Sequence, residues 1–167
     1  MTKLRYILPL LALCAFLAIE SCETADNPCL QPRLTLLRAG AYKRAADTGT
    51  AVLDSALPNP IFIALTTFTT NNIFIQKTGT NKFGFQLSDL SDTCRWVIRP
   101  DSATFVQDTL TFIYQRQLHF ISNVCGYTYY YNLTQPVLTT HHAIDSVRIN
   151  NNDITSNASV EHLKIYY

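Results

Sequence analysis

The sequence predicts an all-β domain, an antiparallel β-sandwich of about nine short strands, from three observations. Runs rich in Thr, Tyr, Phe and Ile recur about every 10 residues, with turn-forming residues between them. In the clearest run Leu110, Phe112 and Tyr114 alternate with Thr111 and Ile113, which is the period of a half-buried strand. No long helical period is visible, and the lack of a uniform up-and-down period favours a sandwich over a barrel.

Loop-forming residues bound the first two expected strands. Arg33–Arg38 is rich in Leu and Thr and is expected to be the first strand. Residues 39–51 contain glycines and alanines and are expected to form a loop. Pro58 and Pro60 precede the second strand, Ile61–Phe68, because proline is tolerated at strand starts and edges.

Two turn clusters divide the next segment. Residues 70–72 and 78–81 are rich in Thr and Asn, and runs separated by such clusters are typical of hairpins. Strands are therefore expected at Ile73–Lys77, Phe83–Leu87 and Thr93–Arg99.

A further hairpin is expected after residue 109. Its strands are Leu110–Tyr114 and Leu118–Ile121, with a polar break at residues 116–117. Gly126 indicates a bulge or a close backbone approach. The remaining strands are expected at Tyr127–Leu133, Ile144–Ile149 and Val160–Tyr167.

The N-terminus has the pattern of a lipoprotein signal peptide. Lys3 and Arg5 precede Tyr6–Ile19, an uncharged run of about 14 residues, shorter than the roughly 20 residues that span a bilayer. Ser21 is a small residue of the kind that a lipoprotein signal peptidase accepts, so Cys22 is expected to be the lipidation site. A cysteine with more than one acyl chain would hold the protein stably on a membrane. The alternatives are a plain secretory signal and an uncleaved anchor.

This N-terminus divides the chain into a signal peptide at 1–21, a lipidated tether at 22–31 and a single β-sandwich domain at 32–167. Cleavage leaves about 146 residues, the size of one ordinary domain. The expected location is the cell envelope, as an outer-membrane lipoprotein on the periplasmic or the surface face.

Charge excludes several classes of partner. The chain has 13 basic and 12 acidic residues, and cleavage removes Lys3, Arg5 and Glu20, which leaves equal numbers of each. Without a basic cluster we expect no nucleic-acid partner and no polybasic membrane patch. The expected partners are the membrane, through the lipid anchor, and an envelope protein.

Three cysteines remain beyond the anchor, namely Cys29, Cys94 and Cys125. Unpaired thiols are uncommon in an oxidising compartment, so we expect one disulfide and one buried free cysteine. Cys29 with Cys125 is the favoured pair, since it would join the tether to the central strands and stabilise by about 4 kcal/mol in the chain-entropy model. The alternative is that none pairs and all three are small core residues.

Short motifs spread over most of the chain after Cys22 carry a family resemblance. They are Cys22 followed by Cys29 and Pro32, Phe85–Leu87 leading to Thr93, Asp108–Tyr114, Ile121–Gly126, Ile144–Ile149 and His162–Tyr166. Together they resemble a family of small Bacteroidota lipoproteins of unknown function, and Ser122–Gly126 is the most distinctive part. The resemblance implies an envelope lipoprotein and implies no activity, and Cys94 lies outside the pattern.

The candidate metal ligands are His141, His142 and Asp145, since imidazole and carboxylate are usual Zn ligands. Neighbouring residues on a strand point to opposite faces, so both histidines could bind one ion only from a loop. His119 and His162 could join them only if the fold brings them near. The favoured interpretation is that these are solvated or hydrogen-bonded loop histidines, and no cofactor is expected.

An aromatic run supplies the candidate ligand-binding residues. On a strand Tyr127, Tyr129 and Tyr131 share one face and Tyr130 takes the other. The first three could form a stacking platform for a sugar or an aromatic ligand. Tyr is equally suited to a strand at the boundary between core and surface, without any binding role.

The sequence carries no motif for catalysis. We find no nucleophile elbow, phosphate-binding loop, zinc-protease helix or calcium loop, and Cys125 has no neighbouring histidine to activate it. A non-enzymatic, lipid-anchored envelope protein that serves as a binding or assembly module is therefore the favoured function. The alternatives are a carbohydrate- or metal-binding lipoprotein that uses Tyr127–Tyr131 or the group at 141–145, and a hydrolase without a visible motif.

Overall fold

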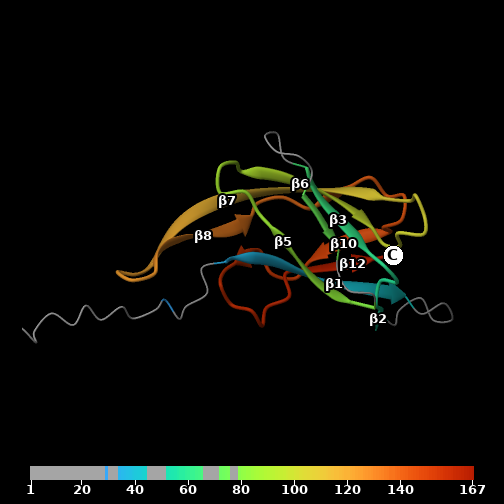
Figure 1. Ribbon diagram of the computed structural model, residues 1–167, viewed down its shortest axis with the longest axis horizontal. Coiled ribbons are helices and arrows are strands. Elements are labelled where there is room, and N and C mark those ends of the chain that lie inside the picture. Colours follow the sequence, from blue (N-terminus) through green and yellow to red (C-terminus); the bar gives the residue numbers. More distant parts are fainter. Residues whose placement is uncertain (1–28, 30–33, 45–51, 66–71, 76–78) are drawn as a thin grey trace, which may run out of the picture.

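The chain folds into two β-sheets that pack against each other (Figure 1). The computed structural model describes residues 29, 34–44, 52–65, 72–75 and 79–167, and this part of the chain has twelve strands and no helix. The predicted all-β sandwich is therefore confirmed. The strands are β1 (Leu36–Arg44), β2 (Val52–Asp54), β3 (Ile61–Leu65), β4 (Asn72–Ile75), β5 (Lys82–Gln86), β6 (Thr93–Arg99), β7 (Asp108–Ser122), β8 (Gly126–Leu133), β9 (Leu138–Thr139), β10 (Ser146–Ile149), β11 (Asp153–Ile154) and β12 (Leu163–Tyr166).

Strand β1 is the centre of the first sheet, which has the order β10-β12-β1-β2 with β5 also paired to β1. One edge of β1 pairs in parallel with β12, in the register Ala39↔Leu163. Its other edge pairs antiparallel first with β5 and then with β2. The strand nearest the N-terminus thus holds the last strand of the chain in place.

Strand β7 is the spine of the second sheet, which has the order β11-β8-β7-β6-β3-β4, with β9 also paired to β7. The first half of β7 pairs with β6 as far as Ile113, opposite Thr93. From Tyr114 to Ser122 it pairs with β8, and beyond the sandwich the two strands continue as a ribbon toward the left of Figure 1. We call residues 115–132, which form this ribbon and its turn, the β7–β8 arm.

An aromatic cluster fills the space between the sheets. Phe85 of the first sheet is fully buried, and its ring lies 5.3 Å from that of Phe112 and 5.5 Å from that of Trp96 in the second. Phe62 and Phe83 contact the same ring at 5.8 and 5.7 Å. Buried aromatic side chains contribute much of the stability of such a core.

The predicted end of the first strand was wrong. Residues 39–44, expected as a loop, continue β1, and the rest of that loop lies outside the described residues. Ala39 and Ala41 are buried, and a Cβ at Gly40 would collide with the carboxylate of Glu161 and the ring of Tyr42. The small residues that suggested a loop are required here by close packing.

The predicted hairpin around residues 116–117 was also wrong, because β7 is one strand of 15 residues. The chain reverses at 123–125, and Gly126 has a φ of 73°, a left-handed conformation that favours glycine. A register shift between Phe120 and Ser122 places the irregularity expected near Gly126 in the opposite strand. The polar residues 116–117 lie where β7 leaves the core, and this position explains the break in the alternation.

Three short strands were not predicted, namely β2, β9 and β11, whose two or three residues are too few for a pattern. The other strands lie close to their expected positions. The ends expected at 66–68 and 76–77 fall outside the described residues, as do the signal peptide and the tether apart from Cys29. No described helix is long and apolar enough to cross a membrane.

The predicted disulfide is confirmed. Cys29 is bonded to Cys125 in the turn at the end of the arm, across 96 residues of sequence. Cys94 is a free cysteine, and burial raises the pKa of its thiol to about 11. The chain at position 29 is therefore fastened to the far end of the arm.

We predict that Phe85→Ala lowers the free energy of unfolding by about 3–5 kcal/mol, because it leaves a cavity among four aromatic rings. Urea denaturation followed by circular dichroism measures the change. Phe105→Ala is the control, since that side chain is 90% exposed and its loss should change stability by at most about 0.5 kcal/mol. Equal effects of the two substitutions would contradict the position of the core.

We predict that stability declines below about pH 6.5, the usual pKa of histidine, because of His162. This side chain is fully buried and accepts a hydrogen bond from the backbone N–H of Arg38, and burial and the charge of Arg38 lower its pKa. The unfolded chain binds a proton on His162 more readily than the folded chain does. The contribution of the neutral His162 to the free energy of unfolding is therefore complete above the pKa of the unfolded state. It is lost as the pH falls from there through the pKa of the folded state. A histidine titration by NMR that placed the pKa of His162 at or above 6.5 would contradict this account.

Candidate functional site

A cleft of about 310 Å³ opens where the β7–β8 arm leaves the sandwich. One wall comes from the arm, through Leu118 of β7 and residues 127–129 and 131 of β8. The other wall comes from the chain just before β1 and from the end of β5 with the loop after it. Its residues are Leu34, Thr35, Gln86, Leu87 and Asp89.

The three candidate tyrosines all line this cleft. Exposure decreases along the strand, from 62% for Tyr127, through the half-buried Tyr129, to 7% for Tyr131. Tyr131 also packs edge-on against Tyr114, with ring centroids 5.3 Å apart. Tyr131 therefore belongs to the core at the inner end of the cleft, and Tyr127 lies at its rim.

Tyr130 occupies the opposite face, as the alternation predicted. Its ring stacks on His119 at 4.2 Å and its hydroxyl lies 3.2 Å from that of Ser156. It is not among the residues that line the cleft. The two faces of β8 thus have separate environments.

The hydroxyls of Tyr131 and Thr35 differ in their surroundings. Burial, together with the negative charge of Asp89, raises the pKa of Tyr131 to about 12, so its hydroxyl stays protonated at neutral pH. The Thr35 hydroxyl is buried and has no hydrogen-bond partner in the part of the chain that the structure describes. An unpaired buried hydroxyl costs roughly 1–3 kcal/mol.

Arg116 fastens the second wall to the base of the arm. Its Nε donates to the carboxylate of Asp92 and its Nη1 donates to the backbone carbonyl of Asp89, both at 2.6 Å. The hydrogen bond to Asp92 is the main reason that the pKa of Arg116 is raised. On the same wall, the Trp96 indole donates to the backbone carbonyl of Gln86 at 3.1 Å. These contacts set the spacing of the two walls.

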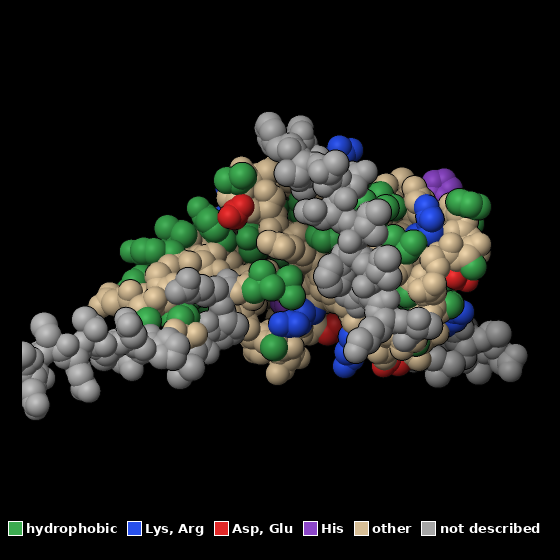
Figure 2. All heavy atoms as spheres, in the orientation of Figure 1, with side chains coloured by type: hydrophobic (Ala, Val, Ile, Leu, Met, Phe, Trp, Pro, Cys, Tyr) green, Lys and Arg blue, Asp and Glu red, His purple; other side chains and the backbone are tan. Residues whose placement is uncertain are grey.

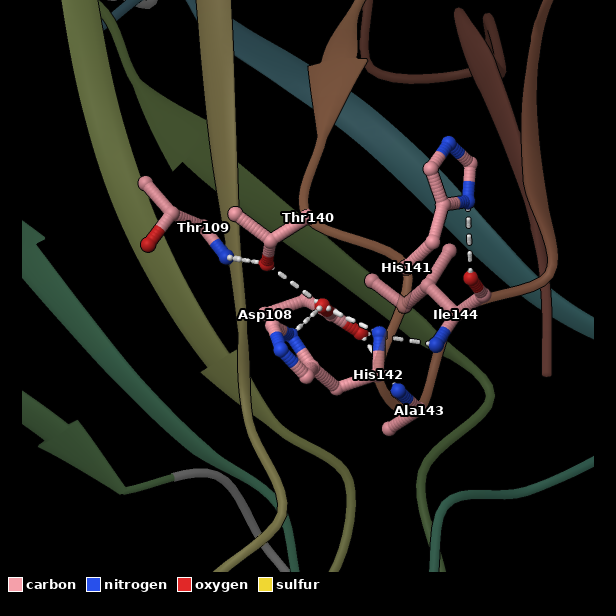
Figure 3. Close-up of polar contacts among 7 residues, drawn as sticks. All are labelled: Asp108, Thr109, Thr140, His141, His142, Ala143 and Ile144. Carbon is pink, nitrogen blue, oxygen red and sulfur yellow. Dashed lines mark hydrogen bonds and ion pairs between the residues drawn. The ribbon is translucent and has the colours of Figure 1, made fainter.

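The predicted metal ligands lie in the loop after β9, which is built around the buried carboxylate of Asp108 (Figure 3). That carboxylate accepts hydrogen bonds from the Thr140 hydroxyl at 2.5 Å and from three backbone N–H groups at 2.6–2.8 Å. The N–H groups belong to His142, Ala143 and Ile144. Asp108 thus determines the path of the loop.

Both histidines make hydrogen bonds, His141 within this loop and His142 to Asp108 at the start of β7. His142 Nδ1 lies 3.1 Å from Asp108, and His141 Nδ1 lies 3.1 Å from the backbone carbonyl of Ile144 (Figure 3). Across the described residues no three His, Cys, Asp or Glu side chains are close enough to hold one ion. His162 is buried in the core, and His119 lies in the arm, where its ring stacks on that of Tyr130.

The hydrogen bonds that Asp108 accepts outweigh the effect of burial on its pKa. Burial alone would raise its pKa, but the Thr140 hydroxyl and the three backbone N–H groups favour the ionised form, so the pKa is well below its usual value. No motif in the sequence indicated a role for this residue. The signal that could have found it is an acidic residue directly before the clearest alternating strand, where burial is expected.

A second hollow, of about 240 Å³, lies between β1, β5 and residues 158–161. Arg38 and Lys82 line it together with Glu161. Both oxygens of the Glu161 carboxylate accept from the Tyr42 hydroxyl, at 2.8 and 3.0 Å, and burial with this contact raises the pKa of Tyr42 to about 12. An acid already bound to a neighbour balances part of the positive charge, and the lining includes only one aromatic ring, that of Phe83. The tyrosine-lined cleft is therefore the stronger candidate.

Comparison with known proteins supplies a family but no activity. A family model described as "Family of unknown function (DUF6452)" matches residues 62–167. The matched region contains β7, β8 and the Asp108 loop, and it begins after β1 and β2. No curated protein matches the chain, and no solved structure does.

We predict that Asp108→Asn lowers the free energy of unfolding at pH 7 by about 1–3 kcal/mol, because an amide NH₂ cannot accept the hydrogen bonds of the loop. Since the folded pKa is lowered, the carboxylate stabilises fully above its unfolded pKa of about 3.9 and less as the pH falls below it. The variant should lose this acid dependence, whereas Asp145→Asn, at an exposed position, should keep it. Denaturation curves from pH 7 to pH 3 measure both effects. Equal curves for the two variants would refute the role of Asp108.

Proposed function

The chain belongs to a family of unknown function, DUF6452, and for this member we propose a lipid-anchored protein of the cell envelope that acts as a non-enzymatic binding module. Its binding surface is the tyrosine-lined cleft at the base of the arm. The observation that carries the proposal is the set of groups in that cleft, where three tyrosine rings at different depths and the polar side chains of Gln86 and Asp89 line one hollow.

Two features support the envelope location. The basic residues, the uncharged run and Ser21-Cys22 form the lipoprotein signal pattern, which would leave an acylated Cys22 on the outer membrane. The Cys29–Cys125 disulfide is typical of an oxidising compartment and rare in a reducing cytosol. A location in the bacterial envelope agrees with both.

A neutral sugar is the ligand chemistry that fits the cleft best. Sugars present apolar faces that stack on aromatic rings, and their hydroxyls both donate and accept hydrogen bonds. Tyr127 and Tyr129 supply the rings, and Gln86 and Asp89 supply polar groups. A metal-binding function has no comparable support, because His141 is hydrogen-bonded to Ile144 and His142 to Asp108.

We predict that protein isolated from the envelope begins at Cys22 and carries acyl chains. Mass spectrometry of the N-terminal peptide measures this directly. Cys22→Ser should leave the protein unacylated and release it from the membrane fraction. An N-terminus at Met1 on cytosolic protein would refute the anchoring.

We predict that Tyr129→Ala weakens sugar binding about tenfold, because it removes a stacking ring from the cleft wall. The control is Tyr130→Ala, which changes the other face of the same strand. An array of neutral oligosaccharides identifies the probe, and calorimetry measures its affinity for each variant.

Two outcomes would contradict the proposed cleft. In one, no oligosaccharide on the array binds the wild-type protein. In the other, Tyr130→Ala weakens binding as much as Tyr129→Ala does.

A further inference from the structure

The far end of the β7–β8 arm exposes large apolar side chains to solvent. Phe120 and Tyr127 are paired across the two strands, with ring centroids 5.1 Å apart, and are 50% and 62% exposed. Val124 in the turn is 52% exposed. Figure 2 shows hydrophobic side chains at the surface along the arm. We call Phe120, Val124 and Tyr127 the arm tip.

The arm tip also lacks charge. From Gln117 to Ile144 the sequence contains no Asp, Glu, Lys or Arg. The last charged residue before this stretch is Arg116, and its side chain bonds to Asp92 at the base of the arm. Exposed apolar clusters of this kind indicate contact with a partner or a membrane. A charge-free segment is suited to a surface of low polarity.

The disulfide determines how far the arm tip can lie from the lipid. Cys125 in the turn is bonded to Cys29, and Cys22 precedes Cys29 by seven residues. Covalent geometry limits seven residues to about 25 Å, whatever their conformation. If Cys22 carries acyl chains, its sulfur lies at the bilayer surface. The turn at Cys125 then lies within about 30 Å of it, because the Cα atoms of Cys29 and Cys125 are a further 5.0 Å apart.

Resting on the proposed lipidation of Cys22, we propose that the arm tip is a membrane contact, in which Phe120, Val124 and Tyr127 enter the interfacial region of the bilayer that holds the anchor. Tyr is a usual residue of this region, since its ring is apolar and its hydroxyl is polar. The absence of cationic side chains matches an uncharged lipid surface, so binding depends on apolar contact and not on anionic headgroups.

This contact gives the lipoprotein an orientation that the lipid alone would not supply. A flexible tether permits any orientation of the domain, whereas a tether and an arm tip hold it at two points. Tyr127 belongs both to the arm tip and to the rim of the cleft. The cleft therefore opens beside the membrane surface.

The test uses the acylated full-length protein in phosphatidylcholine vesicles whose acyl chains carry bromine close to the headgroups, a quencher of tryptophan emission. The variants Phe120→Trp and Val124→Trp place a reporter at the arm tip. Phe105→Trp places one before the start of β7, at the other end of that strand, and the native Trp96 supplies a constant background. Intact mass and flotation with the vesicles first establish that each variant is acylated and bound.

The proposal predicts that bromine removes the emission that F120W and V124W add and leaves that of F105W unchanged. The loss should be the same at low and high salt and with or without anionic lipid. Vesicle-bound, acylated F120W and V124W without quenching would overturn the membrane contact and leave the anchoring intact. A blue shift without quenching that grows with protein concentration would assign the arm tip to a second copy of the chain, and would also overturn it. Failure of acylation or flotation would overturn the anchoring itself and this inference with it.

Discussion

The structure depends on strand β7 being continuous across the boundary of the core. Its inward face begins among the buried side chains Leu110, Phe112 and Tyr114 and continues, without a break in the strand, past Leu118 to Phe120 in the arm. Pairing with β8 carries the second half of the strand beyond the sandwich. The same alternation that builds the core therefore also builds the cleft wall and the apolar arm tip. Core, cleft and arm tip are successive parts of one sheet face.

Two constraints position this face relative to the rest of the chain. Arg116 bonds to Asp92 and Asp89 and so holds the loop after β5 against the base of the arm. At the other end, the Cys29–Cys125 disulfide holds position 29, in the predicted tether, at the turn. Salt would weaken the ion pair between Arg116 and Asp92, since this pair is exposed. The covalent bond would remain, so the arm keeps its connection to the N-terminal segment under conditions that weaken the ion pair.

The sequence predicted the architecture where pattern and burial agree. The alternation at 110–114, the disulfide and the shared face of Tyr127, Tyr129 and Tyr131 all appear as expected. It failed where tertiary contacts override local composition. Gly40 lies against Glu161, more than a hundred residues away, and Ala39 and Ala41 are buried in the core. The polar residues at 116–117 lie within a strand as it leaves the core. The role of Asp108 could not be predicted for the same reason. Its carboxylate is stabilised by backbone N–H groups of residues 142–144, which are distant in sequence.

The central claim is that β7 is one continuous strand paired with β8. The most direct test is to measure nuclear Overhauser effects between the two strands. We expect cross-strand contacts between Leu118 and Tyr129 and between Phe120 and Tyr127, together with contacts between the rings of Tyr114 and Tyr131. Contacts between residues 110–114 and 118–121, as a hairpin turning at 116–117 would give, would contradict the continuous strand, and the cleft and the arm tip would then have no structural basis.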